Sequence, residues 1–252
     1  MTLTWSMVLI AVTGVFLGSV MDAIAGGGGI VTVPTYLLAG LPMHMTLGTN
    51  KLSACIGTLA STGRYIKNGY VNWRLAAPAV LLAMGGSVLG TLLQLRVSER
   101  YLQYVLLLVL PVVAVVVLRQ RQLPEEARDM NPGLQLAVVL TAAFAVGMYD
   151  GFYGPGTGTF LLLIFTRWAG MDVRTASGNV KVVNLSSNIG GVLTAILHGQ
   201  VFWTLGLLAA CAAVAGHYVG AGLAIRNGSR IVRPAVLLVL ALLAAKILAG
   251  LL

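Results

Sequence analysis

The chain has 252 residues, of which 58% are hydrophobic and only 9% are charged. A soluble domain carries roughly 25% charged residues, and intrinsic disorder needs low hydrophobicity with high charge, so both classes are excluded. The 16 Lys and Arg outnumber the 7 Asp and Glu. In so apolar a chain this excess marks cytoplasmic loops and requires no nucleic-acid partner, which leaves a polytopic membrane protein.

Hydropathy and helix breakers divide the chain into ten apolar segments, many near the roughly 20 residues that cross a bilayer core as a helix. They span about 5–25, 30–41, 45–63, 75–95 and 101–118 in the first half, and 134–153, 159–169, 176–197, 202–225 and 232–252 in the second. The first Lys or Arg is Lys51, so we expect the first segment to be a retained helix and not a cleavable signal peptide. The predicted fold class is an all-α membrane helix bundle.

Two segments, 30–41 and 159–169, are too short to span comfortably, and each follows a glycine-rich run. These runs are Gly26, Gly27, Gly28 and Gly29 in the first half, and Gly154, Pro155, Gly156, Thr157 and Gly158 in the second. Each glycine costs a helix roughly 1 kcal/mol relative to Ala, and a broken helix in lipid must be buried or line a cavity. Freed amides there attract anions, although close helix packing also uses small residues. The short segments either span or form re-entrant hairpins.

The two halves resemble each other. With a shift of 130 positions, Lys51 falls on Lys181 and Trp73 on Trp203, and with a slip of two residues Asp22 falls on Asp150. The shift also pairs Gly69 with Gly199, Gly86 with Gly216, Gly90 with Gly220, Arg96 with Arg226 and Arg100 with Arg230. This pattern indicates an internal duplication. We predict a first membrane repeat over 1–118, a cytoplasmic linker over 119–133 and a second repeat over 134–252.

The basic residues predict the orientation in the membrane. If the N-terminus lies outside, the inner loops hold most of the Lys and Arg, and the outer loops hold only Arg96 and Arg100. This asymmetry follows the positive-inside rule. Because five segments per half is an odd number, the two repeats would be inverted. We expect a multi-pass protein of the cell (inner) membrane with both termini outside.

Lys51 and Lys181 lie within apolar segments. A charge at bilayer depth costs at least roughly 2.5–3.5 kcal/mol, so both should face the bundle interior or a wet cavity. Asn184 and Asn188 share the face of Lys181 by i, i+3 and i+7 spacing. A cationic, hydrogen-bonding centre built from two copies suits a small anion. The alternatives are that each lysine snorkels to an interface or pairs with an aspartate for structural reasons.

Asp22 and Asp150 are the only acids well inside apolar segments. They are candidate proton carriers in a coupled transporter, or they cap the broken helix or neutralise the lysines. The pairs Gly86–Gly90 and Gly216–Gly220 have the spacing of helix contacts, and His217 is read as a packing residue. We expect neither a metal nor a cofactor, because no His/Cys cluster and no nucleotide-binding loop are present.

Two stretches resemble the paired signatures of the sulfite exporter TauE/SafE family of membrane transporters, most closely its YfcA-like branch. They read DAIAGGGGIVTVPTYLLAGLPMHMTLGTNK and GMYDGFYGPGTGTFLLL, the latter followed by ASGNVKVVNLSSNIGGVLTAILHGQVFW. The matching positions are Gly26, Gly27, Gly28, Gly29, Pro34, Gly48, Thr49, Asn50 and Lys51, then Gly154, Pro155, Gly156, Gly158, Asn179, Lys181, Asn184, Ser187 and Asn188. Thr157 interrupts the second glycine run, and no counterpart of Pro34 follows it. The resemblance implies movement of small organic or sulfur-containing anions such as sulfite.

We therefore predict a secondary transporter of small anions, not an enzyme, that works by alternating access. The predicted substrate-binding residues are Gly26, Gly27, Gly28, Gly29, Thr49, Asn50, Lys51, Gly156, Gly158, Asn179, Lys181, Asn184, Ser187 and Asn188. The expected partners are the anion and the lipid bilayer, with a homodimer left open. One alternative is an intramembrane enzyme acting on a lipid, with Asp22 and Lys51 as its dyad. Another is a membrane scaffold subunit without transport.

Overall fold

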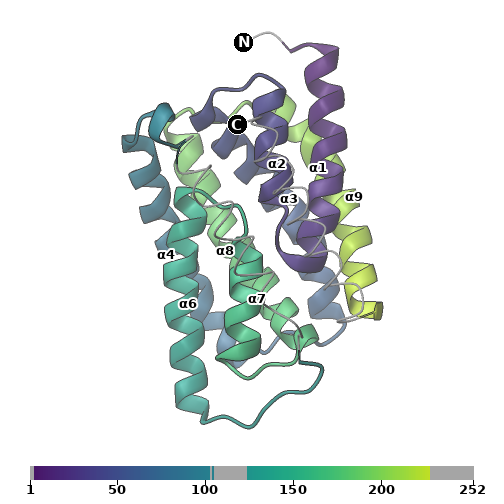
Figure 1. The fold of residues 1–252 in the computed structure, drawn as a ribbon, viewed down its shortest axis with the longest axis vertical. Coiled ribbons are helices and arrows are strands. Elements are labelled where there is room, and N and C mark those ends of the chain that lie inside the picture. The colour runs from purple at the N-terminus through teal and green to yellow at the C-terminus, as the bar shows by residue number, and fades with distance from the viewer. Residues whose placement is uncertain (1–2, 103, 105–123, 228–252) are drawn as a thin grey trace.

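In the computed structural model, residues 3–102, 104 and 124–227 are described, and all regular structure among them is helical (Figure 1). The helices in these ranges are α1 (Trp5–Ala25), α2 (Gly29–Leu38), α3 (Met43–Lys67), α4 (Trp73–Arg96), α6 (Pro132–Phe152), α7 (Thr157–Arg167), α8 (Val173–Leu197) and α9 (Trp203–Asn227). The predicted segment 232–252 and most of 101–118 lie outside the described residues. The all-α prediction is confirmed for the described part of the chain.

The helix lengths agree closely with the predicted segments. Helices α1, α4, α6, α8 and α9 are long and apolar enough to cross a membrane. Helix α3 has 25 residues, as α8 does, but its polar residues keep it out of that group. Helices α2 and α7 have 10 and 11 residues. At 1.5 Å per residue they extend about 15 Å, roughly half of a bilayer core.

The short helices complete two hairpins that enter the bundle from opposite ends. Helix α2 turns back beside α1 toward the end that holds the N-terminus, whereas α6 and α7 enter from the other end (Figure 1). Gly26 ends α1 with a φ of 76°, a left-handed conformation that favours glycine. A Cβ on Gly26 would lie 2.4 Å from the Cα of Gly158. The two hairpin tips therefore meet backbone to backbone.

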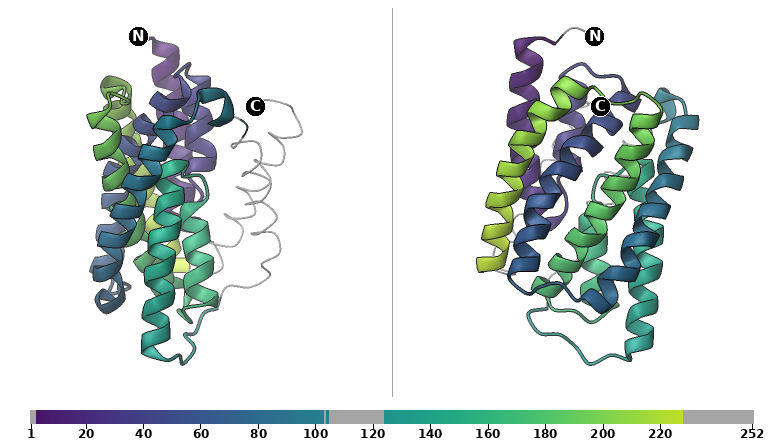
Figure 2. Two further views of the ribbon diagram at one scale, coloured as in Figure 1. Left: turned by 90° about the vertical axis from the view of Figure 1, so that its left-hand side faces the viewer. Right: turned by 180° about the vertical axis from the view of Figure 1, so that it is seen from behind.

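Helices α3 and α8 contact each other and carry the other long helices on their outer sides (Figure 2). Helix α9 packs against α1 and α3, and α4 packs in the same way against α6 and α8. Large apolar side chains such as Leu9, Leu81 and Leu197 are exposed on outer surfaces. Polar side chains are buried instead, which suits a bundle surrounded by lipid.

The paired glycines are helix contacts, as predicted. A Cβ on Gly90 of α4 would lie 1.9 Å from the carbonyl oxygen of Met148 on α6. A Cβ on Gly220 of α9 would lie 2.4 Å from the carbonyl oxygen of Val20 on α1. Any larger residue would push these helices apart, so α4–α6 and α1–α9 are closely packed, equivalent interfaces.

Candidate functional site

A small polar pocket of about 40 Å³ lies where the two hairpin tips meet α3, α8 and α9. This volume holds only a few water molecules. The polar residues and glycines in its wall are Gly18, Ser19, Asp22, Gly26, Gly28, Gly29, Thr32, Asn50, Lys51, Ser53, Asp150, Gly154, Thr157, Gly158, Asn184, Asn188 and His217. Both halves of the chain contribute, so the pocket exists only when the two halves pack together. We call it the central pocket.

One wall of the central pocket holds a buried ion pair between Lys51 of α3 and Asp150 of α6. Two hydroxyls complete the carboxylate's hydrogen bonds. Thr157 donates to Oδ1 at 2.9 Å, and Ser187 donates to Oδ2 at 2.7 Å. The Lys51 ammonium also lies 3.3 Å from Oδ1 of Asn188. Asp150 thus has one charged donor and two neutral donors, none of which is an acid or a histidine.

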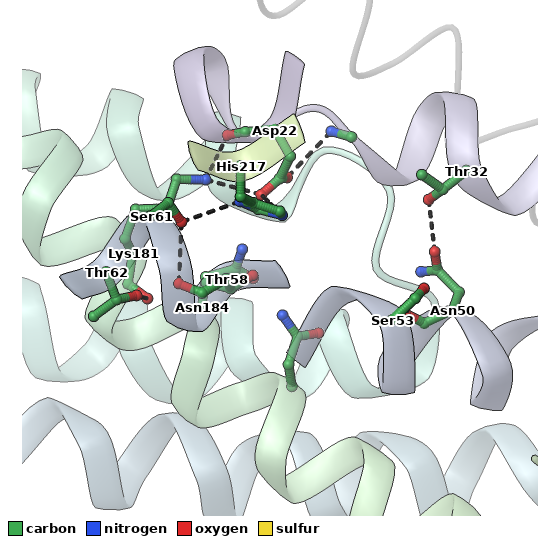
Figure 3. A network of polar contacts seen from close by, with 12 residues as sticks. Asp22, Thr32, Asn50, Ser53, Thr58, Ser61, Thr62, Lys181, Asn184 and His217 are labelled. Atoms are coloured by element: carbon green, nitrogen blue, oxygen red, sulfur yellow. Dashed lines mark hydrogen bonds and ion pairs between the residues drawn. The ribbon is translucent and has the colours of Figure 1, made fainter. Parts of the chain in front are cut away.

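The second ion pair joins Lys181 of α8 to Asp22 of α1, with Nζ 2.8 Å from Oδ2 (Figure 3). The backbone amide of Gly28, at the hairpin tip, donates to Oδ1 of the same carboxylate at 3.2 Å. His217 of α9 places Nε2 3.8 Å from Oδ2, and its Nδ1 lies 3.0 Å from the Ser61 hydroxyl. This carboxylate therefore has a titratable neighbour that Asp150 lacks.

The two ion pairs are crossed between the halves. Each lysine pairs with the aspartate of the other half, whereas the sequence comparison aligns Lys51 with Lys181 and Asp22 with Asp150. This arrangement rules out the dyad of Asp22 and Lys51 considered above, because each of these residues has another partner. Removing two charges from water is costly and is offset only by close pairing. The four groups therefore hold the hairpins to the central helices.

The hairpin formed by α1 and α2 has further polar ties to α3. Thr32 donates to Oδ1 of Asn50 at 2.6 Å, and Tyr36 donates to the Ser53 hydroxyl at 2.8 Å. Figure 3 shows Thr32, Asn50 and Ser53 grouped on one side of this network. These bonds fix the Asn50 side chain against the short helix. A change in the α2 position would therefore move one wall of the central pocket.

The structure places many of the predicted site residues in the central pocket. Those in its wall are Gly26, Gly28, Gly29, Asn50, Lys51, Gly158, Asn184 and Asn188, together with Asp22 and Asp150. Lys181 and Ser187 are not in the wall but bond the two carboxylates that are, Lys181 to Asp22 and Ser187 to Asp150. Thr49 accepts a hydrogen bond from the Phe202 amide at 2.9 Å, and Asn179 donates to the Thr175 carbonyl at 2.8 Å. Gly27 and Gly156 lie in the hairpin turns beside the pocket.

Two residues of the site have roles that the sequence did not reveal. His217 is buried and hydrogen-bonded to Ser61, as expected of a hydrogen-bonded packing residue, and it also lies in the pocket wall beside Asp22. Thr157 looked like an interruption of a glycine run, and its hydroxyl bonds Asp150. The shift of 130 offers one signal for His217, because it falls on Ser87, another polar residue within an apolar segment.

Two kinds of group in the site could bind a ligand. One is a set of amide donors, and the other is the pair of ammonium groups, whose charges are already balanced by carboxylates. Amide donors at the tips and on Asn184 and Asn188 suit an anion's oxygen atoms. A negatively charged ligand must compete with a carboxylate for a lysine. Among the described residues, no group of three or more His, Cys, Asp or Glu side chains is arranged to hold a metal ion.

These features define a polytopic membrane protein with a polar site at the meeting point of two broken helical hairpins. The chain belongs to the sulfite exporter TauE/SafE family, whose sequence profile matches residues 10–247. It is therefore a member of a family of probable membrane transporters, as the resemblance implied. The relatives below are named as transporters, which agrees with the expectation that this chain is not an enzyme.

Three curated relatives illustrate the similarity. "Probable membrane transporter protein ORF9" of Sinorhizobium sp is 35% identical over 237 residues, covering 93% of this chain and 89% of the relative. "Probable membrane transporter protein YfcA" of Escherichia coli K12 is 34% identical, covering 92% and 86%. A "Probable membrane transporter protein" of Haemophilus influenzae is 32% identical, covering 92% and 90%. No solved structure matches the chain significantly.

Proposed function

We propose that this protein is a secondary transporter of small anions, of the sulfite or sulfonate class, with the central pocket as its substrate site. The observation that carries the proposal is the burial of two lysines at the meeting point of the broken hairpins. Lys51 is 6% exposed and Lys181 is 2% exposed. Placing ammonium groups inside a membrane bundle is costly, and such groups are typical of substrate pathways. The family's sulfite exporter description favours the same substrate class.

The crossed ion pairs supply a mechanism. An incoming anion replaces a carboxylate as the partner of Lys51 or Lys181, while Asn184, Asn188 and the tip amides hydrogen-bond its oxygen atoms. The released carboxylate is then left without its counter-ion, and this favours uptake of a proton. Anion binding and proton uptake would be coupled in this way, with Asp22 or Asp150 as the proton carrier.

Alternating access would follow from the duplicated architecture. We infer that residues 1–118 and 134–252 are inverted repeats, since the two hairpins enter from opposite ends and the helix contacts are reciprocal. Rocking of one repeat against the other would expose the central pocket to each side in turn. The distribution of basic residues favours an inner-membrane location with the N-terminus outside.

Anion uptake into proteoliposomes tests the proposal. The wild-type protein should take up sulfite, thiosulfate, a sulfonate or a carboxylate, and the variants Lys51→Ala and Lys181→Ala should lose that flux. Lys67→Ala is the matched control. Lys67 is exposed at the end of α3, so this variant should transport normally. Anion flux that survives both pocket substitutions would show that the site is wrong. A wild-type protein that moves only cations or sugars would overturn the anion assignment.

A further inference from the structure

A second, smaller cavity lies on the other side of Lys51 from the central pocket. It measures about 10 Å³, roughly the space of one water molecule. Its walls come from the first turns of α3, the last turns of α4 and α8, and the end of α6. The loops at this end of the bundle are those on the side of the N-terminus (Figure 2). Lys51 lines both cavities and separates them.

Buried polar atoms without a partner are concentrated around this second cavity. Among the described residues, Nε2 of Gln94, the hydroxyl of Tyr153 and Nε2 of His44 have no hydrogen-bond partner, and all three side chains line the cavity. Gln94 is 3% exposed and Tyr153 is 2% exposed. Burying such groups unpaired is unfavourable, so their concentration in one place points to a polar occupant.

A fourth unpartnered group lies next to the ammonium-bearing side chain. The Ser87 hydroxyl is fully buried and has no partner among the described residues. A Cβ on Gly191 would lie 3.1 Å from this hydroxyl and 3.2 Å from Cδ of Lys51. Gly191 therefore leaves the space that lets Ser87 sit beside the lysine chain. The hydroxyl extends the row of donors from the second cavity toward Lys51.

The groups in this row match an anion. The amide nitrogen of Gln94 and the hydroxyls of Tyr153 and Ser87 donate hydrogen bonds, and Lys51 supplies a positive charge. At the mouth, Nδ1 of His44 lies 3.3 Å from Glu99, which is exposed on the surface.

Two of the polar residues that line the second cavity have apolar counterparts in the other half. The shift of 130 places Gln94 on Ala224 and Thr91 on Ala221. Both alanines lie in a large apolar core cluster that also contains Ala23 and Tyr65. At these two positions the polar side chain is therefore not a by-product of the predicted duplication, whereas Ser87 falls on the polar His217.

We propose that Gln94, Tyr153 and Ser87 form a second anion-binding site, between the central pocket and the N-terminal end of the bundle, with Lys51 shared by the two sites. This inference rests on the proposed anion transport. In the structure Lys51, which lines both cavities, is paired with Asp150. An anion arriving at the second site would draw the ammonium away from Asp150 and so open the way to the central pocket.

Thiol labelling from each face tests the second site. In a background of Cys55→Ala and Cys211→Ala, Gln94→Cys is compared with its matched control Ala224→Cys. The probes are an anionic sulfonatoethyl and a cationic trimethylammonioethyl methanethiosulfonate, each corrected for its reactivity with free cysteine. We expect Gln94→Cys to react from the N-terminal face at least about tenfold faster with the anion, by analogy with electrostatic attraction in charged clefts. Ala224→Cys should react with neither probe from either face.

Three results would overturn the second site: equal rates for the two probes, reaction only from the opposite face, or no reaction of a folded Gln94→Cys protein. A second variant covers the case in which the cysteine variant does not fold. Tyr153→Phe removes only a hydroxyl and should raise the half-saturating anion concentration about tenfold, the effect of losing one strong hydrogen bond; an unchanged value would contradict the site. Failure of the proposed function would show separately, as absent anion flux in the wild-type protein.

Discussion

The two ion pairs of the central pocket join the same residue types, a lysine and an aspartate, but have different surroundings. Asp150 is bound by Lys51 and by the hydroxyls of Thr157 and Ser187. Asp22 is bound by Lys181 and the Gly28 amide, with His217 beside it. Hydroxyls hold a charge in place and do not ionise, whereas an imidazole can take up or release a proton. One ion pair therefore has only fixed donors around it, and the other has an imidazole beside it.

The comparison first predicts that the two lysines differ in their importance for stability. Lys51→Met leaves Asp150 buried with neutral donors only and should lower the free energy of unfolding by about 3–5 kcal/mol. Lys181→Met should cost less, because a protonated His217 can replace the lost charge beside Asp22. Thermal unfolding of the two purified variants in detergent measures the difference.

The double variant Lys51→Met/Asp150→Leu is the control for this prediction. Replacing both partners removes the unpaired charge, so most of the lost stability should return while anion flux stays absent. A double variant that is as unstable as the single one, or one that transports anions, would contradict the role given to this pair.

The helix interfaces, unlike the ion pairs, should respond alike in the two halves. Gly90→Ala and Gly220→Ala each place a methyl group against backbone of the facing helix, and each should destabilise by about 1–3 kcal/mol. Gly85 on α4 has open space around it. Gly85→Ala should therefore stabilise slightly, by up to about 1 kcal/mol. Melting temperatures that rank these three variants differently would show that the interfaces are not equivalent.

Thr157→Gly would make the second hairpin tip resemble the first. The change removes the hydroxyl that donates to Asp150 at 2.9 Å. We expect a loss of about 1.5–3 kcal/mol, of the size of one hydrogen bond to a charged group, and a lower rate of transport. Thr157→Ser keeps the hydroxyl and should behave like the wild type in unfolding and flux assays. If the glycine variant matches the serine variant in both, the hydroxyl has no role in holding Asp150.

His217→Gln should have the smallest effect on stability and a specific effect on pH dependence. The charged groups near His217 are Asp22 on α1 and Lys181 on α8. From α3, the Ser61 hydroxyl contacts the imidazole, and Arg64 donates a hydrogen bond to the carbonyl of Tyr218, the residue after His217. Without the imidazole, anion flux should vary less with pH, because Asp22 loses the titratable side chain that lies 3.8 Å from its carboxylate. Ser187→Ala should lower flux without changing its pH profile. The same pH profile in both variants would remove His217 from the proton pathway.

Much of the fold could be predicted from the sequence because hydropathy and glycine act locally. Segment 134–153 matches α6 (Pro132–Phe152), and segment 159–169 matches the short helix α7 (Thr157–Arg167) within two residues at each end. The small-residue spacing of Gly86 and Gly90 correctly indicated a helix contact. These signals depend on neighbours along one helix, which the sequence displays directly.

The pairing within the site could not be predicted in the same way. Lys51 and Asp150 are 99 residues apart, and their meeting depends on how the second hairpin packs against α3. The sequence left open whether the lysines face an interface, an anion or an aspartate. The sequence also gave no sign that the hydroxyl of Thr49, a predicted substrate-binding residue, accepts a hydrogen bond from the amide of Phe202. A polar residue on a helix shows that it needs a partner, but only the packing identifies which one.

Ligand-dependent melting of the purified protein tests whether the crossed ion pairs bind an anion. We expect sulfite, thiosulfate or a sulfonate to raise the melting temperature with increasing concentration, because a ligand that binds only the folded state stabilises it by mass action. The shift should be lost in Asn188→Ala, whose side chain lies beside Lys51 in the pocket wall. Stabilisation by cations or sugars alone, or an anion effect that is unchanged in Asn188→Ala, would contradict an anion site at the crossed ion pairs.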